Sequence, residues 1–205
     1  MSKRELITAE LERVGMRRGM YCRSAQIAKR EAPAADGGEL TKARWILVTE
    51  QPVMMFDWRF YEFMPEVLLA SGVSAPEQVP LLDNHRRDSF DDMLGSVGDY
   101  VLTDVGGVAA VEGEVRFDTR QKAKDAAGMV ARGHLKDGSI GYTYEDEDVI
   151  YIPKDMTVNV AGKSYVGPVK VVIKSRQIEF SLTPIGADTL AKVKRMIIED
   201  KKNGL

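Results

Sequence analysis

The chain is poor in the residues that form disulfides and bind metals. Cys22 is the only cysteine among 205 residues, and His85 and His134 are the only histidines. A single cysteine excludes an intrachain disulfide, which fits a reducing compartment. Two histidines and one cysteine argue against a zinc site, and Cys22 has no histidine nearby in the sequence to make it a catalytic thiol. The sequence therefore predicts a function that requires no cofactor.

Long apolar runs and a strong net charge are also missing. No apolar stretch approaches the ~20 residues of a membrane span, and the first ten residues lack the apolar core of a secretion signal. The formal net charge is -2, which gives no overall nucleic-acid signature. We therefore expect no membrane partner, and the overall charge argues against nucleic acid as a partner.

Positive charge is nevertheless concentrated at the start of the chain. Residues 1–30 hold eight Lys or Arg and only three acids, and residues 32–39 form a Pro- and Gly-rich stretch typical of a linker. We expect a basic N-terminal arm and linker over 1–40 and a globular domain over 41–205. The arm could contact nucleic acid or an acidic partner, or it could be a solvated helix over 3–18.

Short β-type runs dominate the globular part. Alternating apolar and polar residues predict a hairpin in which 94–102 pairs with 108–117. Residues 66–70 fit either a helical turn or a strand. Further strands are expected at 45–49, 53–56, 79–82, 169–173 and 177–182, near Ser139, and in a second hairpin over 157–166.

Helical patterns are fewer than strand patterns. One helix is expected from Asp118 or Thr119, as its N-cap, to about Arg132, and a final helix over 189–202 with Asp188 as its N-cap. Since no strand–helix alternation repeats, we predict an α+β fold with a mainly antiparallel β-barrel or sandwich.

Three polar residues are candidates for catalytic chemistry, the first of which is His85. It follows the apolar run 79–82 in a charged cluster, and a histidine at a strand end is well placed to act as a base. The alternative is a surface histidine in a charged turn.

Ser139 is the candidate nucleophile. It stands between Gly138 and Ile140-Gly141, where small neighbours let a substrate carbonyl approach and expose backbone N–H groups to an oxyanion. Asp137 occupies the place of the first glycine of a nucleophile elbow, so that motif is not met. The alternative is a serine in an ordinary turn.

Glu179 is the candidate third residue of a catalytic triad with His85 and Ser139. Alternation over 177–182 places the apolar residues on one face of a strand and Gln177, Glu179 and Ser181 on the other. A carboxylate in so apolar a strand could orient a histidine. The alternative is a solvent-facing glutamate.

The order of four segments resembles the caudoviral prohead protease family. These segments are Val79-Pro80-Leu81-Leu82-Asp83-Asn84-His85-Arg86, Leu94-Gly95-Ser96-Val97, Gly138-Ser139-Ile140-Gly141-Tyr142 and the stretch from Ile178-Glu179-Phe180-Ser181-Leu182 to Asp188. Members of that family carry a histidine after an apolar strand, a Ser-x-Gly motif and a strand of the type Glu-x-Ser-Leu-x-Pro. The resemblance covers roughly residues 45–195.

The resemblance implies a fold like that of the herpesvirus assemblins, an antiparallel barrel wrapped by helices and often dimeric. It implies a serine endopeptidase with His85, Ser139 and Glu179 in that order. Assemblins use a second histidine as third member, but His134 precedes Ser139 here and breaks the order. The implied substrates are the scaffolding segment of the major capsid protein and the protease itself, cleaved inside the assembling prohead in the host cytoplasm. A catalytically inactive, protease-like scaffold that nucleates capsid assembly is the alternative.

Overall fold

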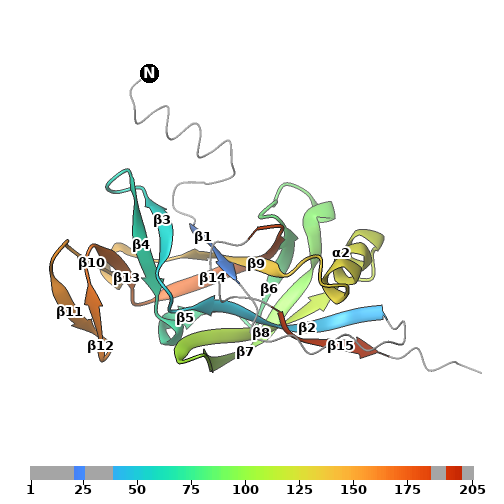
Figure 1. Cartoon of the computed structure of the whole chain (residues 1–205). Coiled ribbons are helices and arrows are strands. Elements are labelled where there is room, and N and C mark those ends of the chain that lie inside the picture. The colour runs from blue at the N-terminus through green and yellow to red at the C-terminus, as the bar shows by residue number, and fades with distance from the viewer. Residues whose placement is uncertain (1–20, 26–38, 186–192, 200–205) are drawn as a thin grey trace, which may run out of the picture.

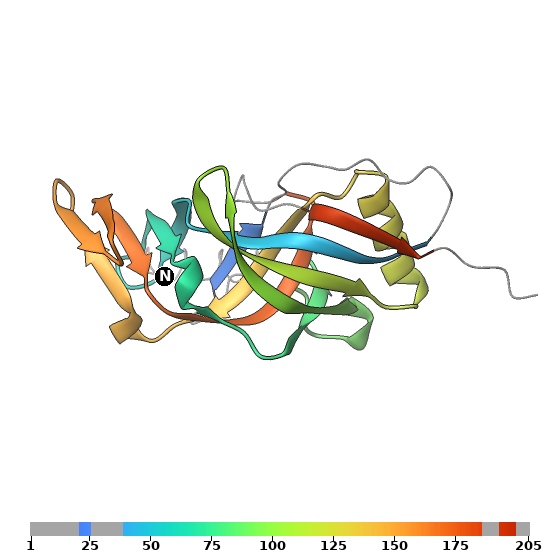
Figure 2. The same cartoon turned by 90° about the horizontal axis from the view of Figure 1, so that it is seen from below.

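The protein is built mostly of β-strands. The computed structural model describes residues 21–25, 39–185 and 193–199. They form a nine-stranded sheet, a four-stranded sheet and a separate hairpin, and most strand pairs are antiparallel. The nine-stranded sheet curls into a half-barrel (Figures 1 and 2).

The large sheet follows the order β1-β9-β14-β6-β7-β8-β2-β15, with β5 beside β14. Because the sheet curls, β1 also contacts β2. The strands are β1 (Tyr21–Ala25), β2 (Glu39–Thr49), β5 (Val73–Ser74), β6 (Gln78–Asp83), β7 (Met93–Val105), β8 (Val108–Phe117), β9 (Asp137–Thr143), β14 (Ser175–Thr183) and β15 (Val193–Glu199).

The concave side of this sheet holds the main core. Trp45 of β2 and Phe180 of β14 are fully buried there and pack edge to face, with ring centroids 5.7 Å apart. Helix α2 (Gln121–Ala131) contacts β2, β7 and β8 and buries Ala123, Ala127 and Val130. Full burial of an apolar side chain of the size of Val or Phe stabilises the folded state by ~1.5–3 kcal/mol. The predicted pairing of 94–102 with 108–117 is confirmed by β7 and β8.

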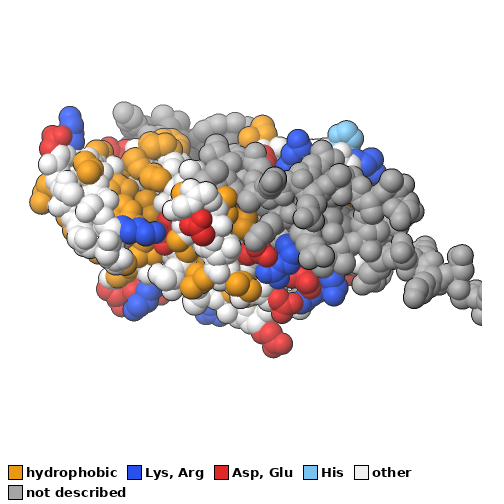
Figure 3. Space-filling view, turned by 60° about the horizontal axis from the view of Figure 1, so that its bottom comes forward, with side chains coloured by type: hydrophobic (Ala, Val, Ile, Leu, Met, Phe, Trp, Pro, Cys, Tyr) orange, Lys and Arg blue, Asp and Glu red, His pale blue; other side chains and the backbone are white. Residues whose placement is uncertain are grey.

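The smaller sheet has the order β10-β13-β4-β3 and its own apolar cluster. Its strands are β3 (Val53–Asp57), β4 (Glu62–Leu68), β10 (Val149–Ile152) and β13 (Val169–Val172), and the hairpin beside it is β11 (Thr157–Val160) with β12 (Lys163–Val166). Of residues 66–70, the first three end strand β4, and Ala70 begins a 3₁₀ turn. Three 3₁₀ turns complete the described structure: η1 (Ala70–Gly72), η2 (Phe90–Asp92) and η3 (Asp146–Asp148). Hydrophobic side chains gather over the end of the molecule formed by this sheet and hairpin, on the left in Figure 3.

A buried ionic cluster lies in the smaller sheet. Lys170 of β13 and Glu66 of β4 are fully buried, and Nζ of Lys170 lies 2.6 Å from Oε2 of Glu66 and 3.1 Å from Oδ2 of Asp57. Burial alone lowers the pKa of Lys170, but the two carboxylates raise it more, so the net shift is upward. Tyr142 of β9 donates a hydrogen bond to Glu66, which ties the cluster to the large sheet.

Replacing Lys170 with Met is expected to lower the free energy of unfolding by about 3–5 kcal/mol, because two buried carboxylates lose their cation. Urea denaturation at pH 7 measures this change. Lys174→Met is the matched control, because Lys174 is exposed and pairs with Asp148 at 3.4 Å on the surface. The control should change stability by about 1 kcal/mol or less. A Lys170→Met variant as stable as the control would show that the Lys170 ammonium does not stabilise the two buried carboxylates.

The same cluster predicts a loss of stability in acid. Burial raises the pKa of Asp57, but the Lys170 ammonium lowers it more, and the net shift is downward. A depressed folded-state pKa contributes stability above the unfolded value of about 3.9, and this contribution disappears as the pH falls through the folded value. Denaturation between pH 7 and pH 3 should therefore show a steeper loss for the wild type than for Asp57→Asn. Parallel curves for the two proteins would refute this.

Two sequence-based expectations about helices need correction. The helix predicted over 189–202 is wrong across 193–199, where the chain forms β15 antiparallel to β2. The run Val193 to Glu199 is rich in β-branched residues, and pairing with an exposed sheet edge overrides its helical spacing. The helix near 118–132 is confirmed, but it begins after Arg120, and Asp118 accepts a hydrogen bond from the Arg120 backbone N–H rather than capping the helix.

In the residues that the structure describes, the fold is therefore mostly β, and the set of helices expected around the sheet is not seen there beyond α2. In the described ranges α2 is the one α-helix. The helix expected over 3–18 and residues 32–38 of the expected linker lie outside the described residues, whereas Glu39 begins β2. Strand β1, within the expected N-terminal arm, pairs with β9. None of the helices in the described part of the chain has the length and apolarity to cross a membrane.

Candidate functional site

His85 sits in a tight turn at the end of β6. The backbone N–H of Arg86 donates to the carbonyl of Asp83 at 3.0 Å, and Asn84 and His85 have φ values of +50° and +61°. This is the pattern of a type I′ turn, and Asn and His tolerate positive φ better than most residues. The backbone N–H of His85 also donates to Ser181 Oγ at 3.0 Å. The turn therefore fixes the imidazole against the end of β14.

The imidazole of His85 contacts a buried carboxylate. Nδ1 of His85 lies 2.7 Å from Oε1 of Glu179, which is 2% exposed, and Ser181 Oγ donates to the other carboxylate oxygen at 2.7 Å. The solvent-facing alternative for Glu179 is therefore wrong. A carboxylate at Nδ1 favours the tautomer with the proton on Nδ1, which leaves Nε2 to accept a proton, and it stabilises the imidazolium that then forms.

A β-bulge aims Glu179 at this turn. Gln177 pairs with Tyr142 and Glu179 pairs with Gly141, so that Ile178 is the extra residue. The prediction that Gln177 shares a face with Glu179 is therefore wrong, because Gln177 stands opposite Tyr142, whose ring is in the main core. A bulge places two successive side chains on one side of a sheet, and Ile178 and Glu179 both line the same cavity.

The two glycines around Ser139 make room for the neighbouring strand. A Cβ at Gly141 would collide with the Glu179 carboxylate, and a Cβ at Gly138 would collide with the ring of Phe180. The sequence predicts that these glycines let a substrate approach Ser139. In the structure each one accommodates a side chain of β14, and Gly141 lets the Glu179 carboxylate lie across β9.

Gly141→Ala is accordingly expected to displace the Glu179 carboxylate and to lower any His85-dependent catalytic rate by about 10²-fold, the effect of a misplacement near 1 Å. The readout is the rate constant of peptide cleavage, measured beside the melting temperature. Gly138→Ala is the matched control, because its new methyl group meets Phe180 on the core face instead. A Gly141→Ala enzyme with the rate of the wild type would contradict this role of Gly141.

Ser139 lies next to this group on β9. It stands opposite Ser181 of β14 and Ser24 of β1 in the strand register. Ile140 and Phe180 point into the core, so Ser139 and Ser181 share the other face, with Cβ atoms ~5 Å apart in such a pair. Ser139 is 3% exposed. In the part of the chain that the structure describes, the hydrogen-bonded group of His85, Glu179 and Ser181 does not extend to the Ser139 hydroxyl.

The structure thus brings the three predicted residues into one corner of the sheet. Two further residues, Ser181 and Arg87, contact this group. Ser181 bonds to both His85 and Glu179, and Arg87 places its guanidinium 3.6 Å from Oε1 of Glu179. Ser181 could have been found from its alternation with Glu179, and Arg87 from the basic pair after His85. Arg176 pairs with Thr143 at the far side of the bulge and is exposed, so it does not take part in this group.

His134 does not belong to this site. It follows α2 and is exposed, in keeping with its rejection as third member. Among the described residues no group of three or more His, Cys, Asp or Glu is arranged to hold a metal ion.

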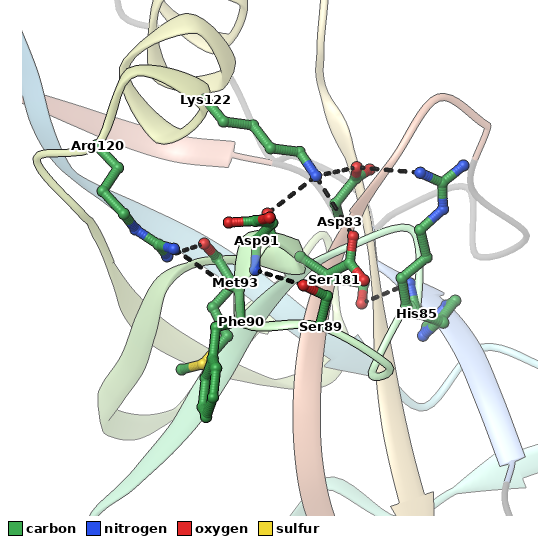
Figure 4. Close-up of polar contacts among 11 residues, drawn as sticks. Asp83, His85, Ser89, Phe90, Asp91, Met93, Arg120, Lys122 and Ser181 are labelled. Atoms are coloured by element: carbon green, nitrogen blue, oxygen red, sulfur yellow. Dashed lines mark hydrogen bonds and ion pairs between the residues drawn. The ribbon is translucent and has the colours of Figure 1, made fainter.

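A cavity of about 790 Å³ adjoins the carboxylate of Glu179. It lies on the same face as Ser139, because Leu82, which lines it, stands opposite Ser181 in the register. The loop after His85 forms its rim, and Figure 4 shows how α2 holds that loop. Lys122 lies 2.9 Å from Asp83 and 3.4 Å from Asp92, and the pKa of Lys122 is raised, mainly by its hydrogen bond with Asp83.

Comparison of the chain with protein-family models, with curated proteins and with solved structures finds no match in any of the three.

Proposed function

We propose that this chain is a serine endopeptidase with Ser139 as nucleophile, His85 as base and Glu179 as the residue that orients the base. One observation carries the proposal: the buried Glu179 carboxylate lies 2.7 Å from Nδ1 of His85, two residue pairs along the sheet from Ser139 and on the same face. A buried carboxylate on a histidine nitrogen orients the base in triad-type acyl transfer, and Ser139 lies on the same face of the sheet.

The proposed reaction proceeds in two halves. Ser139 Oγ attacks the carbonyl carbon of the scissile peptide bond while Nε2 of His85 takes the hydroxyl proton. The tetrahedral intermediate then expels the amine, which receives that proton from His85, and an acyl-serine remains. A water molecule repeats the sequence and releases the carboxylic acid. Glu179 stabilises the imidazolium in each half, and Ser181 holds Glu179 in place.

The biological substrate follows from the resemblance and not from the site. The order of His85, Ser139 and Glu179 is that of the prohead proteases, and a curled, mostly antiparallel sheet accords with the barrel of the assemblins. We propose that the substrates are the scaffolding segment of the major capsid protein and the protease itself. Cleavage would take place inside the assembling prohead, in the host cytoplasm, where confinement raises the effective concentration of enzyme and substrate.

A second candidate is a catalytically inactive, protease-like scaffold that nucleates capsid assembly. The burial of Ser139 favours it, because a nucleophile that is 3% exposed needs a rearrangement before it can meet a substrate. The pairing of β1 with β9 beside Ser139 also narrows access to that strand. This candidate retains the fold and has no use for the His85–Glu179 contact.

Intact masses after co-expression with the capsid protein of the same genome distinguish the two. The protease proposal predicts shortened capsid protein with the wild type and full-length capsid protein with Ser139→Ala. Particles that assemble normally with unshortened capsid protein in both cases would favour the scaffold. Glu147→Gln, in the exposed acidic turn η3, serves as the control for expression level and handling.

A further inference from the structure

The cavity beside Glu179 has a mostly apolar lining that also includes the polar side chains of Gln78, Ser89 and Ser96, with charged residues at one end. Its apolar members are Val79, Pro80, Leu82, Phe90, Met93 and Ile178. Arg87 and Asp88 lie at the rim, with Glu179 beside them. The cavity and the His85–Glu179 pair therefore share a wall, so that a molecule in the cavity touches the same carboxylate that orients the imidazole.

Two large side chains on this wall face solvent. Phe90 is 85% exposed and Met93 is 37% exposed, and Figure 4 shows them side by side, pointing away from α2. Exposed apolar side chains around a concavity mark a surface that a ligand covers. The lining is thus incomplete without an apolar partner.

The loop that carries these side chains is held in place. The guanidinium of Arg120 donates to the carbonyls of Phe90 and Met93, and Nζ of Lys122 donates to the carbonyl of Asp91 at 3.1 Å. Ser89 Oγ accepts from the backbone N–H of Asp91 at 3.1 Å. These contacts keep the cavity open in the absence of a ligand, so that binding does not have to order the loop first.

We propose that this cavity binds one bulky apolar side chain, of the size of Leu, Met or Phe, from an extended substrate peptide whose scissile bond lies at Ser139. The inference rests on the proposed protease function and adds a substrate class to it. A charged side chain in the cavity would meet both Arg87 and the carboxylates of Asp88 and Glu179 at the rim, and it would lose water against the apolar walls. An alanine would leave the space between Phe90, Met93 and Ile178 unfilled.

Binding to the Ser139→Ala protein tests this without cleavage. The probes are four acetylated, amidated Gly/Ser/Ala octapeptides that differ at one central position, which is Leu, Ala, Glu or Lys. The protein carries ¹³C-methyl methionine, so that Met93 reports from the cavity and Met156, exposed in another part of the chain, serves as internal control. Met93→Leu assigns the Met93 signal.

The expected result is a shift of the Met93 methyl signal by the Leu peptide, with Met156 unmoved. The affinity should be at least about 10-fold higher for the Leu peptide than for the Ala, Glu and Lys peptides. Phe90→Ala should weaken binding of the Leu peptide by about 10-fold, whereas Val166→Ala, also at an exposed apolar side chain but on β12, should not. Equal affinity for the four peptides, or a Leu-dependent shift at Met156 alone, would overturn the proposal.

Cleavage of the same peptides by the wild type separates the two levels of inference. Selective binding at Met93 without cleavage of any peptide or protein would retain the cavity and reject the protease. Ser139-dependent cleavage with no preference for the Leu peptide would retain the protease and reject the assignment of the cavity.

Discussion

Ser139→Ala is expected to lower the rate of peptide-bond cleavage by about 10⁶-fold, the effect found when a triad nucleophile is removed. In the proposed mechanism the hydroxyl oxygen of Ser139 forms the bond to the carbonyl carbon of the substrate, and no other atom of the residue can replace it. The residue is small and buried opposite Ser181, so loss of one oxygen should leave the fold and the melting temperature almost unchanged. The measurement is the cleavage rate of the scaffolding segment, with melting curves recorded in parallel.

Ser164→Ala provides the matched control, because Ser164 lies on β12 in the separate hairpin and is exposed. It should cleave like the wild type. If Ser139→Ala retained most of the activity, the nucleophile would be a different residue. Ser181 would be tested next, since its hydroxyl already contacts Glu179.

Glu179→Gln is expected to lower the cleavage rate by about 10⁴-fold, as loss of the charge on the orienting carboxylate does in other triads. The variant keeps the shape of the side chain. Its amide can donate to Nδ1 of His85, which favours the tautomer whose proton sits on Nε2, and that nitrogen can then no longer accept a proton from Ser139. It also removes the negative charge that stabilises the imidazolium.

Stability gives this prediction its control. Glu179 is buried, so a neutral amide in its place should not destabilise the protein as loss of a cation at Lys170 does. Glu147→Gln, on an exposed turn, should change neither rate nor stability. A Glu179→Gln enzyme that retained more than about a tenth of the wild-type rate would remove Glu179 from the proposed triad.

The hairpin of β7 and β8 could be predicted from the sequence because its signals are local. Alternation over 108–117 and the turn at Gly106-Gly107 lie within a few residues of each other. The strand at 193–199 could not, because its partner β2 is about 150 residues away in the chain. Local spacing favours a helix there, and only the unpaired edge of β2 decides otherwise.

The same distinction holds for the site. His85 and Glu179 could be proposed because each has a distinctive local setting, a histidine after a strand and a carboxylate within an apolar run. The bulge at Ile178 depends on the register between β9 and β14, which no local pattern encodes. Ser181 lies two residues from Glu179 on the same face of β14, so its contact could be found from alternation, whereas the contact of Arg87 with Glu179 depends on the pairing of β6 with β14.

The burial of Lys170 is also a feature that the local sequence does not predict. In a strand predicted from the apolar run 169–173, a lysine is expected to face solvent. It is fully buried because Glu66 on the neighbouring strand and Asp57 on the next one supply two carboxylates at its ammonium group. Only the order β13-β4-β3 brings these three residues together.

Covalent labelling tests most directly whether His85 activates Ser139. Diisopropyl fluorophosphate phosphorylates a serine that has a working base, with loss of fluoride, and peptide mapping by mass spectrometry locates the diisopropylphosphoryl adduct. We predict an adduct on Ser139 of the wild type, and a much lower yield in His85→Ala and Glu179→Gln at unchanged melting temperature. An unlabelled Ser139 in the wild type, or equal labelling in all three proteins, would contradict the account.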